Sequence, residues 1–189
     1  MVRVSSTSFP LASRGTLGYD AEEVDRAFRV ARQRYDNFDN GTQGKRLSTS
    51  SIRHTAFTMR KGGYSAPHVD AALERLEDAV AIRERDEHID RVGRDVFLRE
   101  TKTTARAVLA RLRREDGERF DRVSVLQRGY DVKEVDEFSS RLADFLRGGT
   151  AMSLREVRGV AFTPKRHGYK ETQVDLLIDA VIDVMLAIR

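Results

Sequence analysis

The stretch Gly18-Tyr19-Asp20-Ala21-Glu22-Glu23-Val24-Asp25 sets the pattern of this chain, because the same frame occurs four times. The frame consists of Gly-Tyr, four variable residues and Val-Asp, and no copy contains an insertion. Repetition of this kind predicts a fold assembled from similar units. The other three copies are Gly63-Tyr64 to Val69-Asp70, Gly129-Tyr130 to Val135-Asp136 and Gly168-Tyr169 to Val174-Asp175.

Each frame predicts the beginning of an amphipathic helix. Asp20 is a suitable N-cap, and Glu23 stands three residues later, where it completes a capping box. Asp131 and Glu134 repeat this arrangement in the third copy. Apolar residues then recur at helical spacing, as they do from Val24 onward, so each helix has one apolar face.

These patterns predict a mainly α fold, in which helical repeats each follow a short extended Gly-Tyr loop. Only the second and fourth copies follow a short helix, so the chain divides into two halves of two copies each. The apolar residues between 123 and 126 are compatible with a short strand ahead of the third copy. The predicted divisions are residues 1–92 (copies at about 8–36 and 51–92, joined by a linker at 37–50), a connecting helix at 93–117, and residues 118–189 (copies at about 120–148 and 153–189).

Every invariant residue of the frame has a structural interpretation. The glycine either adopts a positive φ or passes close to another segment, and the tyrosine adds a large ring with a hydroxyl that needs a partner when buried. The valine faces the core, and the aspartate accepts from loop N–H groups or an arginine, which ties loop to helix. These fold-defining residues are Gly18, Tyr19, Val24, Asp25, Gly63, Tyr64, Val69, Asp70, Gly129, Tyr130, Val135, Asp136, Gly168, Tyr169, Val174 and Asp175.

The four aspartates also raise the alternative of an acidic cluster for metal or acid–base chemistry. Four equivalent positions on four repeats seldom converge on one point, and no histidine accompanies them at ligand spacing. The sequence contains neither a nucleophile elbow nor a phosphate-binding loop motif, and the absence of cysteine excludes thiolate chemistry. We therefore expect no enzymatic activity, no cofactor and no metal site.

Positive charge gathers just ahead of each Gly-Tyr pair. The chain as a whole carries 34 Lys and Arg against 30 Asp and Glu, so its net charge of +4 is compatible with an anionic partner without requiring one. Basic loops can contact lipid headgroups or nucleic-acid phosphates, and the remaining alternative is ordinary solvated charge. The candidate membrane or partner residues are Arg14, Leu17, Arg60, Lys61, Arg128, Lys165 and Arg166.

The order phenylalanine, loop and Gly-Tyr-Asp-x-x-Glu-Val-Asp, as from Phe9 to Asp25, resembles the N-terminal domain of DivIVA, a bacterial cell-division and pole-marking protein. The segment from Leu154 to Phe162 is also similar to the start of that domain. The resemblance covers more than half of the chain and extends to DivIVA-domain repeat proteins of high-GC Gram-positive bacteria. It implies a non-enzymatic interaction or scaffold protein in cell division or polar growth. Such a protein would have protein partners, weak anionic-membrane contact and a place at the septum or cell pole.

The chain departs from the family pattern in its loop tips and in its assembly. In DivIVA an exposed Phe followed by Arg precedes Gly-Tyr and inserts into the membrane, whereas Leu17 is the one apolar side chain among the residue pairs that precede the four glycines here. No stretch sustains coiled-coil heptads over three or more repeats. Because the family domain dimerises, two copies in one chain can pair with each other as a monomeric pseudo-dimer, with a homodimer as the alternative.

Two further expectations concern location and the alternative function. No apolar run approaches the roughly 20 residues needed to span a bilayer, and the N-terminus has no signal-peptide pattern, so we expect a cytoplasmic protein. The alternative to a division scaffold is a nucleic-acid-associated protein that uses its basic loops. Nucleic acid is the less favoured partner, because the two halves of the chain have similar, mixed charge.

Overall fold

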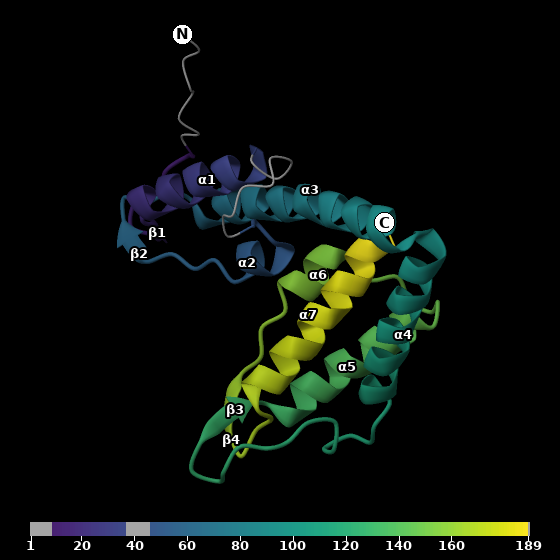
Figure 1. Ribbon diagram of the computed structural model, residues 1–189. Coiled ribbons are helices and arrows are strands. Elements are labelled where there is room, and N and C mark those ends of the chain that lie inside the picture. The colour runs from purple at the N-terminus through teal and green to yellow at the C-terminus, as the bar shows by residue number, and fades with distance from the viewer. Residues whose placement is uncertain (1–8, 37–45, 189) are drawn as a thin grey trace. The chain divides into compact units, whose positions relative to one another are not determined.

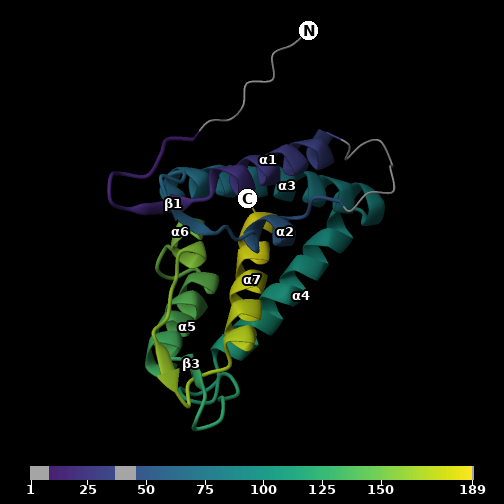
Figure 2. The same cartoon turned by 90° about the vertical axis from the view of Figure 1, so that its left-hand side faces the viewer.

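The computed structural model describes residues 9–36 and 46–188, and these residues form seven helices and four short strands. The mainly helical class predicted from the sequence is confirmed. The residues fall into two compact units with a boundary between Asp86 and Glu87 (Figures 1 and 2). No helix in the described ranges is both long enough and apolar enough to cross a membrane.

Unit 1 is a pair of helices joined at one end by a two-stranded ribbon. Both views show α1 running alongside α3. Strands β1 and β2 are antiparallel, with Gly18 opposite Arg60. Val24 and Val69, the valines of the two frames, are fully buried with Tyr64 beside this ribbon. The elements are β1 (Leu17–Tyr19), α1 (Ala21–Asp36), α2 (Thr49–Arg53), β2 (Met59–Lys61) and α3 (Ala66–Val92), which extends past the boundary.

Unit 2 repeats this order and adds one helix. Strands β3 and β4 are antiparallel, with Gly129 opposite Lys165, and Val135 and Val174 are buried with Phe120 and Tyr169. The additional helix, α4, packs against both α5 and α7. The elements are α4 (Arg94–Leu112), β3 (Arg128–Tyr130), α5 (Val132–Leu146), α6 (Leu154–Arg158), β4 (Pro164–Arg166) and α7 (Glu171–Ala187).

Three segments differ from the sequence-based expectations. The helix predicted as a connector at 93–117 is α4, which belongs to unit 2 because its buried Val108 and Leu112 join that unit's core. The strand β3 is Arg128–Tyr130, which includes the Gly-Tyr pair of the third frame, rather than the apolar stretch before that frame. Most of the predicted linker, residues 37–45, lies outside the described residues, but Ser48 within it is the N-cap of α2.

The capping boxes predicted at Glu23 and Glu134 are wrong. Asp20 does cap α1, since its Oδ1 accepts from the N–H groups of Glu22 and Glu23 at 2.9 and 3.1 Å. The Glu23 carboxylate, however, accepts from the backbone N–H and the hydroxyl of Thr58, at 2.8 and 3.0 Å. Glu134 binds Thr163 in the same way, at 2.7 and 2.9 Å. Each glutamate thus anchors the segment that leads into the second strand of its unit, a long-range contact that local sequence does not show.

Candidate functional site

In each unit the two Gly-Tyr frames lie directly against each other. The N–H of Tyr19 donates to the carbonyl of Tyr64 at 2.9 Å, and the N–H of Tyr64 donates back to Tyr19 at 2.8 Å. Tyr130 and Tyr169 make the same reciprocal pair in unit 2, at 3.0 and 2.9 Å. The frames are therefore joined backbone to backbone.

This close approach explains the frame glycines. A Cβ atom on Gly63 would lie 2.7 Å from the carbonyl carbon of Gly18, and one on Gly168 would lie 2.7 Å from that of Gly129. Real Cβ atoms do not approach backbone that closely. The positive φ, +73°, belongs instead to the neighbouring Gly62. Of the two explanations that the sequence left open, close approach accounts for the frame glycines.

Each frame tyrosine reaches the aspartate of the opposite frame. The hydroxyl of Tyr169 donates to Asp136 Oδ1 at 3.0 Å, and that of Tyr64 lies 3.4 Å from Asp25 Oδ2. Burial, followed by the hydrogen bond to Asp136, raises the pKa of Tyr169 to about 12. The two remaining pairs, Tyr19 with Asp70 and Tyr130 with Asp175, are also hydrogen-bonded, and burial followed by the nearby carboxylate raises the pKa of each tyrosine.

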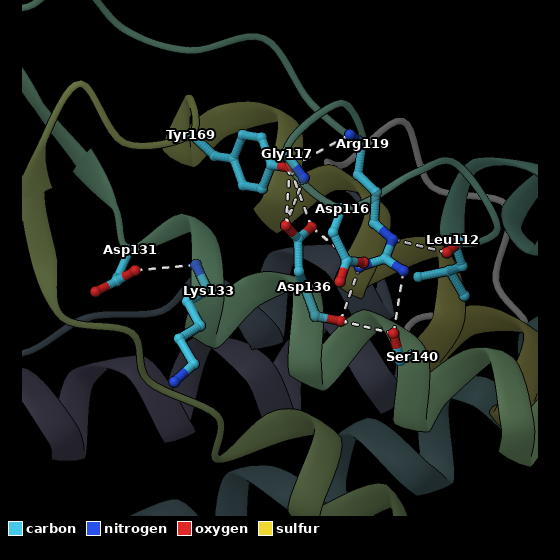
Figure 3. A network of polar contacts seen from close by, with 9 residues as sticks. All are labelled: Leu112, Asp116, Gly117, Arg119, Asp131, Lys133, Asp136, Ser140 and Tyr169. Carbon is cyan, nitrogen blue, oxygen red and sulfur yellow. Dashed lines mark hydrogen bonds and ion pairs between the residues drawn. The ribbon is translucent and has the colours of Figure 1, made fainter.

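Asp136 also belongs to a buried polar network around Arg119 (Figure 3). Its Oδ2 accepts from the N–H of Gly117 at 2.7 Å, and its Oδ1 lies 3.0 Å from Nη1 of Arg119. Arg119 is only 6% exposed and also donates to the carbonyls of Leu112 and Asp136, both at 2.8 Å, and to the hydroxyl of Ser140 at 3.0 Å. Asp136 thus has both kinds of partner expected for it, a loop N–H and an arginine. The network joins α5 to the loop after α4.

Arg119 was not among the sequence candidates. It stands ten residues ahead of Gly129, and its buried carboxylate partner, Asp136, is the last residue of that frame and lies in α5. Its ion pair with Asp116, at 2.9 Å, is local, but the contacts with Asp136 and Ser140 form only when the loop folds back onto α5, so no local pattern marks the residue as buried. Burial of the charge is tolerated because the guanidinium meets a carboxylate and several further acceptors.

The frame aspartates do not form a common site. Asp25 and Asp70 are paired with different tyrosines in unit 1, and Asp136 and Asp175 with different tyrosines in unit 2. Within residues 9–36 and 46–188, no group of three or more His, Asp or Glu side chains is placed to hold a metal ion. The arrangement cross-links two frames in each unit.

Two of the basic candidates take part in the fold. Arg60 Nε lies 2.8 Å from Asp20 Oδ2, and Lys165 Nζ lies 2.8 Å from Asp131 Oδ2. Both cations are in second strands rather than in loops, and both reach the N-cap aspartate of the other frame in their unit. The hydrogen bond from Lys165 holds the pKa of Asp131 below its usual range. These side chains support the starts of α1 and α5.

The other basic candidates are exposed, and two of them face each other. Arg128 lies directly opposite Arg166 across the β3–β4 ribbon, and neither guanidinium is ion-paired with any residue that the structure describes. In unit 1 the corresponding partners are Leu17 and Lys61, and Arg14 lies in the exposed turn before β1. Of the two ribbons, only that of unit 2 therefore places two arginines directly opposite each other.

An exposed apolar turn lies beside this arginine pair. The N–H of Gln127 donates to the carbonyl of Ser124 at 3.0 Å, which closes a turn around Val125 and Leu126. Val125 is 66% exposed and Leu126 is 85% exposed. From the sequence, both are compatible with a short strand, and Leu17 is the one apolar side chain among the two residues before each glycine. Leu126, three residues before Gly129, was missed for that reason.

Comparison with known proteins does not assign a family. No protein-family model, no curated protein and no solved structure matches the chain. The function is therefore argued from two features of the molecule, the internal cross-links between frames and the exposed ribbon of unit 2.

Proposed function

We propose that this chain is a non-enzymatic interaction protein of the DivIVA type, a scaffold in bacterial cell division or polar growth. In this proposal each unit is a pseudo-dimer, in which two frames of one chain pair as two identical chains would. The reciprocal bonds between Tyr19 and Tyr64 support it, because the same groups are exchanged in both directions, as at a two-fold interface. The saturated contacts of Arg119 and Asp136 support a structural rather than a catalytic role for the buried charges.

The observation that carries the proposed membrane contact is the pairing of Arg128 with Arg166 beside the exposed Leu126. Like charges directly opposite each other on neighbouring strands are destabilising, so the fold itself gains nothing from this pair. An anionic lipid surface would neutralise both arginines, at roughly 1 kcal/mol per charge, and accept the apolar side chain. Nucleic acid would account for the arginines but not for the apolar turn, which makes it the less favoured ligand.

Co-sedimentation with vesicles tests this contact. We expect the chain to bind phosphatidylglycerol vesicles, to bind phosphatidylcholine vesicles much less, and to lose binding as salt is raised. Burying a leucine side chain is worth about 1.5–3 kcal/mol, so Leu126→Ser should lower the partition coefficient about tenfold or more. Leu17→Ser, the same change in the unit 1 ribbon, should leave binding unchanged.

Four outcomes would contradict the proposal. Equal binding by Leu126→Ser and the unaltered chain would exclude insertion of the turn. A DNA mobility shift that survives higher salt than vesicle binding would favour nucleic acid. A tagged copy spread evenly through the cell, rather than at the septum or pole, would argue against a division role. A stable dimer in solution mass measurements would argue against the pseudo-dimer.

A further inference from the structure

Unit 1 contains an open apolar cavity of ≈ 570 Å³ between α1, α2 and the segment around Phe57. This volume lies in the range of sites that take small ligands or single large side chains. The walls are formed mainly by aliphatic and aromatic side chains. They include Ala27, Ala31, Leu47, Ile52, Phe57 and Leu76.

Unit 2 fills the corresponding space with a side chain of its own. When the two units are aligned on their frame glycines, Ala27 corresponds to Phe138 and Phe57 corresponds to Phe162. Phe138 is only 8% exposed, and its ring centroid lies 5.8 Å from that of Phe162 in an edge-on arrangement. Unit 1 keeps the receiving ring, Phe57, but has a methyl group where the second ring stands in unit 2.

The mouth of the cavity differs between the units as well. In unit 2 an ion pair of 3.3 Å joins Arg141 to Glu156, and the corresponding residues of unit 1, Val30 and Ser51, line the cavity without such a bridge. Arg26 also lines the cavity of unit 1, is exposed, and has no ion pair with any residue in the described part of the chain. The nearby Glu23 carboxylate is engaged by Thr58. The mouth therefore presents the Arg26 guanidinium, which has no ion pair with a described residue, beside the Glu23 carboxylate, which only the neutral donors of Thr58 hold, and an apolar interior.

We propose that this cavity binds an aromatic side chain, flanked by a carboxylate, that a partner protein inserts. The ring would occupy the place that Phe138 takes in unit 2, against the ring of Phe57, and the carboxylate would pair with Arg26. Large aromatic anchors buried in such pockets carry most of the energy of many protein interfaces. This inference specifies a partner for the scaffold role, but it concerns unit 1 alone. Its failure is therefore distinguishable from failure of the membrane contact, which depends on the unit 2 ribbon.

Titration of the full chain with a short acidic aromatic peptide tests the proposal. The probe is acetyl-Gly-Asp-Phe-Asp-Gly-amide, observed through the methyl NMR signals of Ile52 and Leu76. We expect these signals to shift on titration. A peptide with alanine in place of the phenylalanine should bind at least about tenfold more weakly. Arg26→Glu should weaken binding, and Arg26→Lys should retain most of it.

A second variant supplies the missing ring from the chain itself. Ala27→Phe copies the arrangement of unit 2 and should abolish the peptide-induced shifts without lowering the unfolding midpoint. The control is Ala110→Phe, which adds the same side chain at an exposed site on α4 and should leave binding unchanged. Should Ala27→Phe fail to fold, the comparison of the two peptides on the unaltered chain decides the question alone.

The proposal is overturned by any of four results. These are no methyl shifts with the phenylalanine peptide, equal binding of the alanine peptide, peptide binding that persists in a folded Ala27→Phe variant, or self-association of the chain that Ala27→Phe removes. The last result would identify a second copy of this chain as the occupant.

Discussion

Replacing Gly63 with alanine tests whether the two Gly-Tyr frames of unit 1 need their close approach. The new Cβ atom would lie 2.7 Å from the backbone of Gly18 and closer still to the carbonyl oxygen of Tyr19, whereas ordinary van der Waals contact begins at 3.4 Å. Neither side of this contact is a flexible side chain, so the two backbones themselves must separate. The perturbation therefore acts directly on the reciprocal bonds between Tyr19 and Tyr64.

The magnitude follows from the distances. A separation of at least about 0.7 Å would stretch those two hydrogen bonds to about 3.5 Å or more, beyond the range of a good N–H to O contact. Each lost bond costs about 1 kcal/mol net, and residual overpacking adds about 1–3 kcal/mol. Alanine also lowers the conformational entropy of the unfolded chain, which offsets about 0.4–1 kcal/mol of this loss of stability. We therefore expect Gly63→Ala to destabilise unit 1 by about 2–4 kcal/mol.

The neighbouring Gly62 is a matched control with a different physical requirement. Its φ is +73°, and a Cβ atom there would meet no other atom within 4 Å. Gly62→Ala should cost about 1 kcal/mol for the left-handed conformation, and Gly62→Asn should cost less because asparagine tolerates that region. The corresponding residue of unit 2, His167, adopts φ 53° without being a glycine.

Urea unfolding followed by circular dichroism measures the free energies, and native-state hydrogen exchange reports on the individual bonds. In Gly63→Ala the amides of Tyr19 and Tyr64 should lose protection together, whereas Gly62→Asn should leave both protected. The reasoning is refuted if substitutions at Gly62 and Gly63 cost the same, or if these amides keep their protection in Gly63→Ala.

Two further predictions concern the ion pairs of unit 2. Arg119→Ala leaves Asp136 buried without a cation and should lower the free energy of unfolding in urea by about 3–5 kcal/mol. Adding Asp136→Asn in a double variant should restore part of this loss. A loss below about 1 kcal/mol would contradict the structural role of the network. Lys165 lowers the pKa of Asp131 in the folded state, so the stability from this pair is present above the unfolded pKa of about 3.9 and is lost as pH falls through the lowered folded value. Lys165→Gln should therefore flatten the acid limb of the stability curve, and an unchanged limb would show that this pair does not contribute to it.

Local features of the structure were predictable from the sequence because their causes are local. Asp20 and Asp131 cap their helices as predicted, since an N-cap bonds N–H groups two or three residues away. The buried frame valines likewise follow from helical periodicity. The prediction for Glu23 and Glu134 was wrong because a contact with Thr58 or Thr163, distant in sequence, replaced the local capping bond.

By itself, the sequence determined that the chain is mainly helical and that four Gly-Tyr frames begin its repeated helices. Only the tertiary structure decided which frames pair with each other. That pairing explains the frame glycines, because the absence of a Cβ atom lets two backbones come close enough to exchange hydrogen bonds. It also decided that Arg119 is buried and that Leu126 is exposed beside two arginines that face each other across a ribbon. These properties depend on segments far apart in the chain, and sequence periodicity reports only the neighbours that a residue has along its own helix or strand.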